Sequence, residues 1–169
     1  LTVGYSVPVA SGVHGQVVSF RDGSDVTVSL FADGSAEPKY TVSVPGGTKD
    51  SSGQYTTTYD IPEVAPGTYT MQVSKKNHVT REYTVTVSGD VKTQNAEIWL
   101  LGDVNGDGVR DMTDVVQICR RFNGKTSVFD NGDAETRAYR LKVADIYADN
   151  SIDTTDINQI LRYYNGKSS

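Results

Sequence analysis

The chain has 169 residues, a formal net charge of −5 and a single cysteine. This length allows one or two small domains, and no stretch approaches the roughly 18 consecutive apolar residues of a transmembrane helix. The acidic balance and the lack of a basic patch argue against a nucleic acid or a membrane surface as partner. One cysteine excludes an intrachain disulfide and a cysteine-based zinc site, so another bound metal is a candidate stabiliser.

The first hundred residues alternate polar and apolar side chains in short runs, which is typical of β-strands. Val26, Val28 and Leu30 fall on one face of such a run. Turn-forming Asp-Gly, Gly-Gly and Pro-Gly pairs separate the runs. The predicted strands cover residues 13–20, 25–31, 40–44, 55–59, 68–73, 82–87 and 94–99. This pattern predicts an antiparallel β-sandwich.

The composition changes after Trp99. From Gly102 onward the chain has ten aspartates and one glutamate, and its apolar residues follow helical spacing. We therefore predict two domains, an all-β module at residues 1–100 and an all-α module at residues 101–169. No Pro-, Ser- or Gly-rich linker separates them, so we expect one semi-rigid unit. Trp99 is expected either at the junction or in the core of one half.

The second half contains an internal repeat with a period of 42 residues. Residues 103–114 and 145–156 both carry Asp at loop positions 1, 5, 9 and 12. In calcium loops, side chains at positions 1, 3 and 5 converge on the ion, position 7 offers its carbonyl, and a carboxylate at position 12 closes the shell. The first copy meets every requirement, with Asp114 in place of the usual Glu. Solvated turns are the alternative for a single loop, and the duplication argues against them.

A helix with the same apolar spacing is predicted after each loop. The stripe comprises Val115, Ile118, Cys119 and Phe122 in the first copy and Ile157, Ile160, Leu161 and Tyr164 in the second. Both helices run into Asn-Gly-Lys, at 123–125 and 165–167, which indicates a glycine C-cap. Each repeat is therefore predicted to be one loop plus one helix, which is half of an EF-hand.

Residues 102–108 and 143–156 resemble the two calcium-binding F-hand segments of the dockerin family. The resemblance implies two calcium ions. It assigns to the first ion Asp103, Asn105, Asp107, the Val109 carbonyl, Asp111 and Asp114, and to the second Asp145, Asp149, the Ser151 carbonyl, Asp153 and Asp156. In the second copy Tyr147 replaces the oxygen-bearing residue at position 3, and Asn150 replaces glycine at position 6. We therefore expect the second loop to bind calcium more weakly, or with an extra water.

The same resemblance implies a partner. Dockerins bind cohesin modules tightly in cellulosome-type extracellular complexes, so we expect a cohesin of a scaffoldin or a cell-surface anchoring protein. The chain is expected to be secreted, with any signal peptide upstream of Leu1, and monomeric before it binds. The expected contacts are Met112, Thr113, Cys119, Arg120, Thr154, Thr155, Leu161 and Arg162. A core role is the alternative for Cys119 and Leu161, and a solvated helix end for the two arginines.

The segment Ile61 to Val73, followed by Lys75 to His78, is similar to X modules that precede dockerins and to carboxypeptidase-regulatory-like sandwiches. This implies an Ig-like or prealbumin-like sandwich that supports the dockerin. The alternative is a carbohydrate-binding module with a platform of Tyr40, Tyr55, Tyr59 and Tyr69. An enzyme is not predicted, because Gly-x-Ser-x-Gly, His-Glu-x-x-His and P-loop motifs are absent and both histidines are expected at the surface. A calcium sensor would need helices on both sides of each loop.

Overall fold

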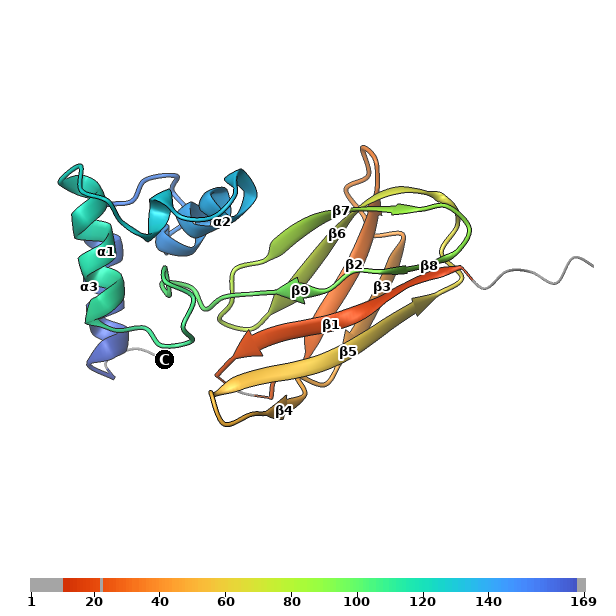
Figure 1. Ribbon diagram of the computed structural model, residues 1–169, viewed down its shortest axis with the longest axis horizontal. Coiled ribbons are helices and arrows are strands. Elements are labelled where there is room, and N and C mark those ends of the chain that lie inside the picture. Colours follow the sequence, from red (N-terminus) through yellow and green to blue (C-terminus); the bar gives the residue numbers. More distant parts are fainter. Residues whose placement is uncertain (1–10, 22, 167–169) are drawn as a thin grey trace, which may run out of the picture.

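The computed structural model describes residues 11–21 and 23–166. A β-rich half is followed by a helical half, and the two meet end to end (Figure 1). Lys167 of the second predicted C-cap and Asp22 of one predicted turn lie outside the described residues.

The β-rich half consists of two sheets. The first has the order β4-β5-β1-β8, with β9 also beside β1, and the second has the order β3-β2-β6-β7. The strands of the first sheet are β1 (Gly12–Phe20), β4 (Thr48–Lys49), β5 (Gln54–Pro62), β8 (Val91–Thr93) and β9 (Ala96–Glu97). Those of the second are β2 (Val26–Ala32), β3 (Tyr40–Val44), β6 (Gly67–Lys75) and β7 (Arg81–Val87).

The two sheets bury a shared apolar core between them, so the half is a β-sandwich. Val26, Val28 and Leu30 of β2 are fully buried, as their alternation predicted. They pack in one cluster with residues of the other sheet, such as Val13 and Val17 of β1.

The sandwich is not wholly antiparallel. Strand β1 pairs antiparallel with β5 but parallel with both β8 and β9. The prediction of an antiparallel sandwich is therefore wrong on one side of β1. The chain crosses from β7 to the other sheet and returns beside β1 as two short strands, where one strand over residues 94–99 was expected. Local alternation carries no information about the direction of a neighbouring strand.

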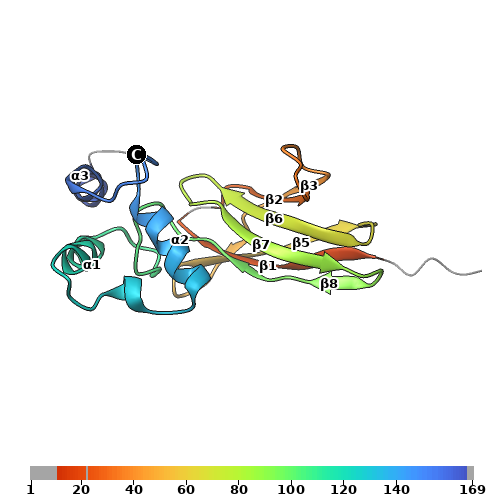
Figure 2. The ribbon, with the colours of Figure 1, turned by 90° about the horizontal axis from the view of Figure 1, so that it is seen from above.

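The helical half contains α1 (Met112–Phe122), the 3-10 turn η1 (Val128–Asp130), α2 (Ala134–Ala144) and α3 (Thr154–Tyr164). Helices α1 and α3 lie side by side, and α2 lies between this pair and the sandwich (Figures 1 and 2). Among the described residues, no helix has both the length and the apolar character needed to cross a membrane.

Sequence reasoning missed α2. Only Tyr139, Val143 and Ala144 of this helix are buried. A helix that buries so few side chains needs only a weak apolar pattern, and so its sequence carried no clear helical signal. Because α2 ends at the residue before Asp145, the second loop has a helix on both sides. The prediction of half an EF-hand therefore holds for the first loop and is wrong for the second.

A second hydrophobic cluster joins the two halves. It contains Phe20, Trp99 and Leu100 together with buried helical residues such as Ile118 and Ile160. The Trp99 ring lies against the Tyr139 ring of α2, with 5.4 Å between centroids. Trp99 is therefore at the junction, which was one of its two expected places.

The Tyr139 hydroxyl connects the halves by hydrogen bonds. It donates to the Val79 carbonyl at 2.7 Å and accepts from the Trp99 backbone N–H at 3.0 Å. The Arg81 guanidinium lies above the same ring, with Cζ 4.7 Å from the centroid. These contacts support the expected semi-rigid connection, whereas the boundary at residue 100 stays a prediction.

Candidate functional site

The first loop, residues 103–114, folds around the carboxylate of Asp103. Its Oδ1 accepts from the N–H groups of Gly106 at 2.9 Å and Asp107 at 3.1 Å, and its Oδ2 accepts from Gly108 at 2.8 Å. Asp103 is fully buried. The residue at position 1 therefore holds the loop together from its centre.

The second loop, residues 145–156, repeats this arrangement. Asp145 accepts from the N–H of Asp149 at 3.1 Å and from that of Asn150 at 2.9 Å. The N–H of Ser151 donates to Asp149 at 2.9 Å, and the first loop has the equivalent bond at the same distance. The sequence repeat is thus also a repeat of hydrogen bonds.

The aspartates at position 12 close both loops. Asp114 accepts from the N–H of Val104 at 2.8 Å and from that of Asp111 at 2.9 Å. Asp156 receives the two equivalent bonds at 2.8 and 2.9 Å. Both side chains are buried at the first turn of a helix. Each therefore connects the start of its loop to the start of the helix that follows.

The aspartates at position 9 are helix N-caps. Asp111 accepts from the N–H of Thr113 at 2.6 Å, and Asp153 accepts from that of Thr155 at 2.7 Å. A carboxylate here satisfies a donor that the helix itself leaves unpaired. Position 9 therefore starts the helix as well as belonging to the predicted ligand set.

The loops differ at position 3, as the sequence indicated. Asn105 Oδ1 accepts from the N–H of Asp107 at 3.0 Å, within the loop. The Tyr147 side chain is 56% exposed, and its hydroxyl lies 3.2 Å from Gln159 Oε1 on α3. The tyrosine oxygen is therefore engaged outside the second loop. At position 6, Asn150 has a φ of +64°, which confirms that asparagine takes the left-handed conformation there.

The electrostatics of the first loop favour a bound cation. Burial, together with the nearby carboxylates of Asp114 and Asp107, raises the pKa of Asp103 to about 7. Burial also raises the pKa of Asp114 to about 6. Buried carboxylates are costly without a compensating charge, and carboxylate and carbonyl oxygens are the ligands that calcium prefers. The donor set of the loop therefore fits calcium by its chemistry.

The side chains do not form a ready-made metal cage. Within residues 11–21 and 23–166, no three His, Cys, Asp or Glu side chains are grouped so as to hold a metal ion. The loop carboxylates are instead directed at backbone N–H groups of their own loops. The two ligand sets, including the carbonyls of Val109 and Ser151, stay predictions.

The predicted partner contacts divide by exposure. Six of the eight are exposed: Met112, Thr113, Arg120, Thr154, Thr155 and Arg162. Cys119 and Leu161 are half-buried and pack against the cluster that joins the two halves. The exposed six lie at the beginnings and towards the ends of α1 and α3. The core alternative is thus supported for Cys119 and Leu161.

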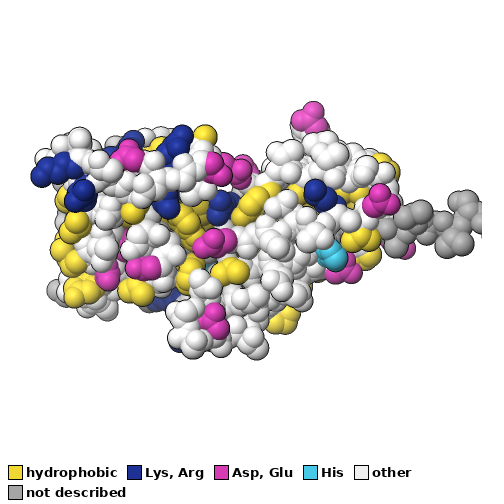
Figure 3. Space-filling model, in the orientation of Figure 1, with side chains coloured by type: hydrophobic (Ala, Val, Ile, Leu, Met, Phe, Trp, Pro, Cys, Tyr) yellow, Lys and Arg dark blue, Asp and Glu magenta, His cyan; other side chains and the backbone are white. Residues whose placement is uncertain are grey.

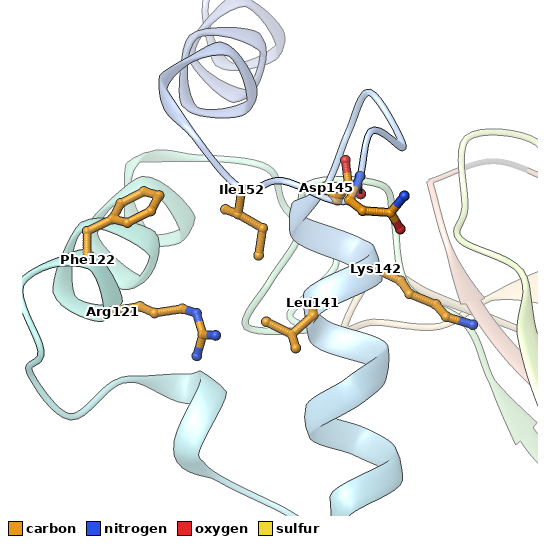
Figure 4. Close-up of a pocket in the computed structure, with 7 residues that line it drawn as sticks. Arg121, Phe122, Leu141, Lys142, Asp145 and Ile152 are labelled. Carbon is orange, nitrogen blue, oxygen red and sulfur yellow. Dashed lines mark hydrogen bonds between the residues drawn. The ribbon is translucent and has the colours of Figure 1, made fainter.

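The apolar stripes predicted both helices, but the last member of each stripe is exposed. Phe122 is 54% exposed and Tyr164 is 56% exposed, because each helix extends beyond the core that buries its earlier turns. Phe122, Leu141 and Ile152 converge on a pocket of about 640 Å³ near Arg121 and Asp145 (Figure 4). Apolar side chains also gather on the helical end of the face shown in Figure 3.

The tyrosine platform does not form on the sandwich. Tyr59 and Tyr69 are buried in the core, and Tyr40 packs edge-on against Tyr69 with 5.9 Å between centroids. Lys75 Nζ lies over the Tyr55 ring at 5.0 Å. Sugar stacking needs exposed ring faces, so this arrangement does not favour carbohydrate binding.

The two histidines differ in their surroundings. His14 is exposed and bonds to Thr93, whereas His78 is half-buried. His78 Nε2 accepts from the N–H of Phe20 at 3.0 Å. His14 is thus at the surface, as expected, whereas His78 is only partly exposed and helps to hold the end of β1.

Comparisons with known proteins find a family match over the region that contains the repeat. The family model described as dockerin type I domain matches residues 101–165. Among curated proteins, none matches the chain. Two crystal structures of type II cohesin–X–dockerin complexes from Acetivibrio cellulolyticus, an N-terminal and a C-terminal interface mutant, show similarity. The first is 22% identical, with 91% of this chain and 95% of that chain covered and a TM-score of 0.39. The second is 19% identical, with 90% and 96% covered and a TM-score of 0.35. Such TM-scores do not establish a shared overall arrangement.

Proposed function

We propose that this chain, which carries a dockerin type I domain at residues 101–165, works as a non-catalytic docking module that binds a cohesin in a calcium-dependent manner. The observation that carries the proposal is the duplicated loop-helix unit, in which the aspartates at positions 1, 5, 9 and 12 accept equivalent hydrogen bonds in both copies. The partner is a cohesin module of a scaffoldin or of a cell-surface anchoring protein. The setting is an extracellular complex of the cellulosome type.

Calcium acts in this proposal by linkage. The ion neutralises the aspartates of each loop and so orders the residues from which α1 and α3 begin. Asp114 and Asp156 each contact both ends of their loop. Ordering a loop therefore sets the direction of the following helix, and with it the exposed residues that meet the partner.

The β-sandwich serves as structural support in this proposal. It corresponds to an X-like module at residues 1–100, and the dockerin module occupies residues 101–169. Its rings at the junction pack on the helical half, and this packing supports treatment of the pair as one working unit.

Titration calorimetry of the whole chain against a panel of type I and type II cohesins tests the proposal. We expect one cohesin class to bind tightly in calcium and binding to disappear in excess EDTA. Restoring calcium should restore the affinity. Unchanged affinity in EDTA would refute the calcium dependence, and no binding to any cohesin would refute the proposed partner.

A further inference from the structure

The first loop packs directly on two aromatic rings of the sandwich half. A β-carbon at Gly106 would lie 2.8 Å from Cε2 of Trp99, and one at Gly108 would collide with the Phe20 ring. A real β-carbon does not approach another atom so closely. The backbone of the first loop is therefore in contact with Phe20 and Trp99 at positions where only glycine fits.

The second loop has the same backbone shape without these contacts. Gly106 and Gly108 have φ values of +77° and +84°, and their counterparts Ala148 and Asn150 have +53° and +64°. Both counterparts are exposed. The left-handed backbone alone therefore does not require glycine. The close approach of the two rings gives a physical reason why the two copies differ in sequence at these positions.

Both rings are held firmly in place. At the end of β1, the Phe20 N–H donates to His78 Nε2 at 3.0 Å and the Phe20 carbonyl accepts from Lys75 Nζ at 3.2 Å. Trp99 Nε1 donates to Glu97 Oε1 at 2.9 Å. Phe20 is 2% exposed and Trp99 is 6% exposed. The sandwich thus presents a fixed surface to the first loop.

We infer that Phe20 and Trp99 are positioning residues of the first calcium loop. They hold the loop near its folded shape before the ion arrives, so less ordering remains to be done on binding. Because coupling is reciprocal, calcium in the first loop also stabilises the contact between sandwich and dockerin. Ala148 and Asn150 of the second loop are exposed, so Phe20 and Trp99 do not position that loop. This inference rests on the calcium dependence proposed above.

Calcium titrations of single-loop variants of the whole chain test the coupling. Asp145→Asn leaves the first loop intact, and Asp103→Asn leaves the second intact. Phe20→Leu is then added to each background, with Phe31→Leu at the other end of the sandwich as the matched control. We expect Phe20→Leu to weaken calcium binding roughly tenfold in the Asp145→Asn background and to leave it unchanged in the Asp103→Asn background.

The single tryptophan of the chain is a built-in reporter. Because Trp99 touches the first loop, its fluorescence should change when calcium fills that loop and stay constant when calcium fills the second. Calorimetry on the same samples counts the ions bound. A fluorescence response that follows only the second loop would overturn the inference.

A complementary variant approaches the contact from the loop side. Gly106→Ala should weaken calcium binding by the first loop, and adding Trp99→Leu should recover part of the loss by making room. Ala148→Gly is the control at the equivalent position of the second loop, where we expect little change. Far-UV circular dichroism establishes that each variant is folded.

Two results separate the inference from the proposed function. Equal losses at both loops, or no loss at either, would overturn only the role of Phe20 and Trp99. Failure of the unaltered chain to bind calcium would overturn the proposed calcium dependence and, with it, this inference.

Discussion

Removing the Tyr139 hydroxyl is the most direct test of the hydrogen bonds that join the sandwich to the helices. Tyr139→Phe removes a donor to the Val79 carbonyl and an acceptor of the Trp99 N–H, at 2.7 and 3.0 Å. The ring remains, so its contacts with Trp99 and Arg81 are kept. The substitution therefore isolates two hydrogen bonds that connect the halves.

The expected loss follows from burial. Tyr139 is 4% exposed and Trp99 is 6% exposed, so the Trp99 N–H left behind has little access to water, whereas Val79 is half-buried. Each unsatisfied buried group costs about 1–3 kcal/mol. We therefore expect the free energy of unfolding to fall by about 2–4 kcal/mol. Burial also raises the pKa of Tyr139, so the hydroxyl stays a donor across the physiological range.

Urea unfolding at a fixed calcium concentration measures this loss. Fluorescence of Trp99 reports the junction, and far-UV circular dichroism reports the sandwich and helices together. Tyr164→Phe, at a position that is 56% exposed, is the matched control and should change stability by less than about 0.5 kcal/mol. A loss below about 0.5 kcal/mol for Tyr139→Phe would refute the argument that these bonds hold the halves together.

Three further predictions concern the dockerin half. Asp114→Ala should weaken cohesin binding more than Asp156→Ala. The reason is that the second loop lacks an oxygen at position 3 and so is expected to bind calcium more weakly from the start. Equal losses of cohesin affinity, measured by calorimetry, would contradict a weaker second loop. The calcium-free chain should be more stable near pH 5 than near pH 8. The folded-state pKa values of Asp103 and Asp114, about 7 and about 6, lie above the ordinary 3.8, so the folded state binds protons more tightly than the unfolded state. This contribution is complete below the unfolded pKa and is lost as pH rises through the folded values. Thermal melts in EDTA measure the stability difference between pH 5 and pH 8, and Asp103→Asn should reduce this difference. An unchanged stability difference would show that Asp103 is not its main source. Finally, Arg120→Ala and Arg162→Ala should each reduce cohesin affinity without changing calcium affinity, and a variant pair that binds cohesin as tightly as the unaltered chain would place the arginines outside the interface.

Much of the candidate site was readable from the sequence because its interactions are local. Loop positions 1, 5, 9 and 12 bond within 11 residues of one another. A helix follows each loop and ends at Asn-Gly, as the repeat predicted, whereas the N-cap role of Asp111 and Asp153 was not foreseen. The left-handed φ at Asn150 follows from the same short-range geometry.

The sandwich core was also readable in part. The alternation in β2 predicted which residues face inward, since side chains on a strand point to opposite sides in turn. The same pattern says nothing about which strand lies alongside, and so the parallel pairing of β1 with β8 and β9 was not foreseen.

By itself, the sequence determined the two loops, the two helices that follow them and the glycine signals that end these helices, because each depends on residues a few positions apart. Only the tertiary structure decided what surrounds them. It placed Phe20 and Trp99 against the first loop, formed α2 before the second loop, and left Phe122 and Tyr164 exposed. These features depend on contacts between residues such as Phe20 and Gly108, 88 positions apart in the chain. No local pattern encodes such a contact. Its one visible consequence in the sequence is that the first loop has glycines where the second loop has an alanine and an asparagine.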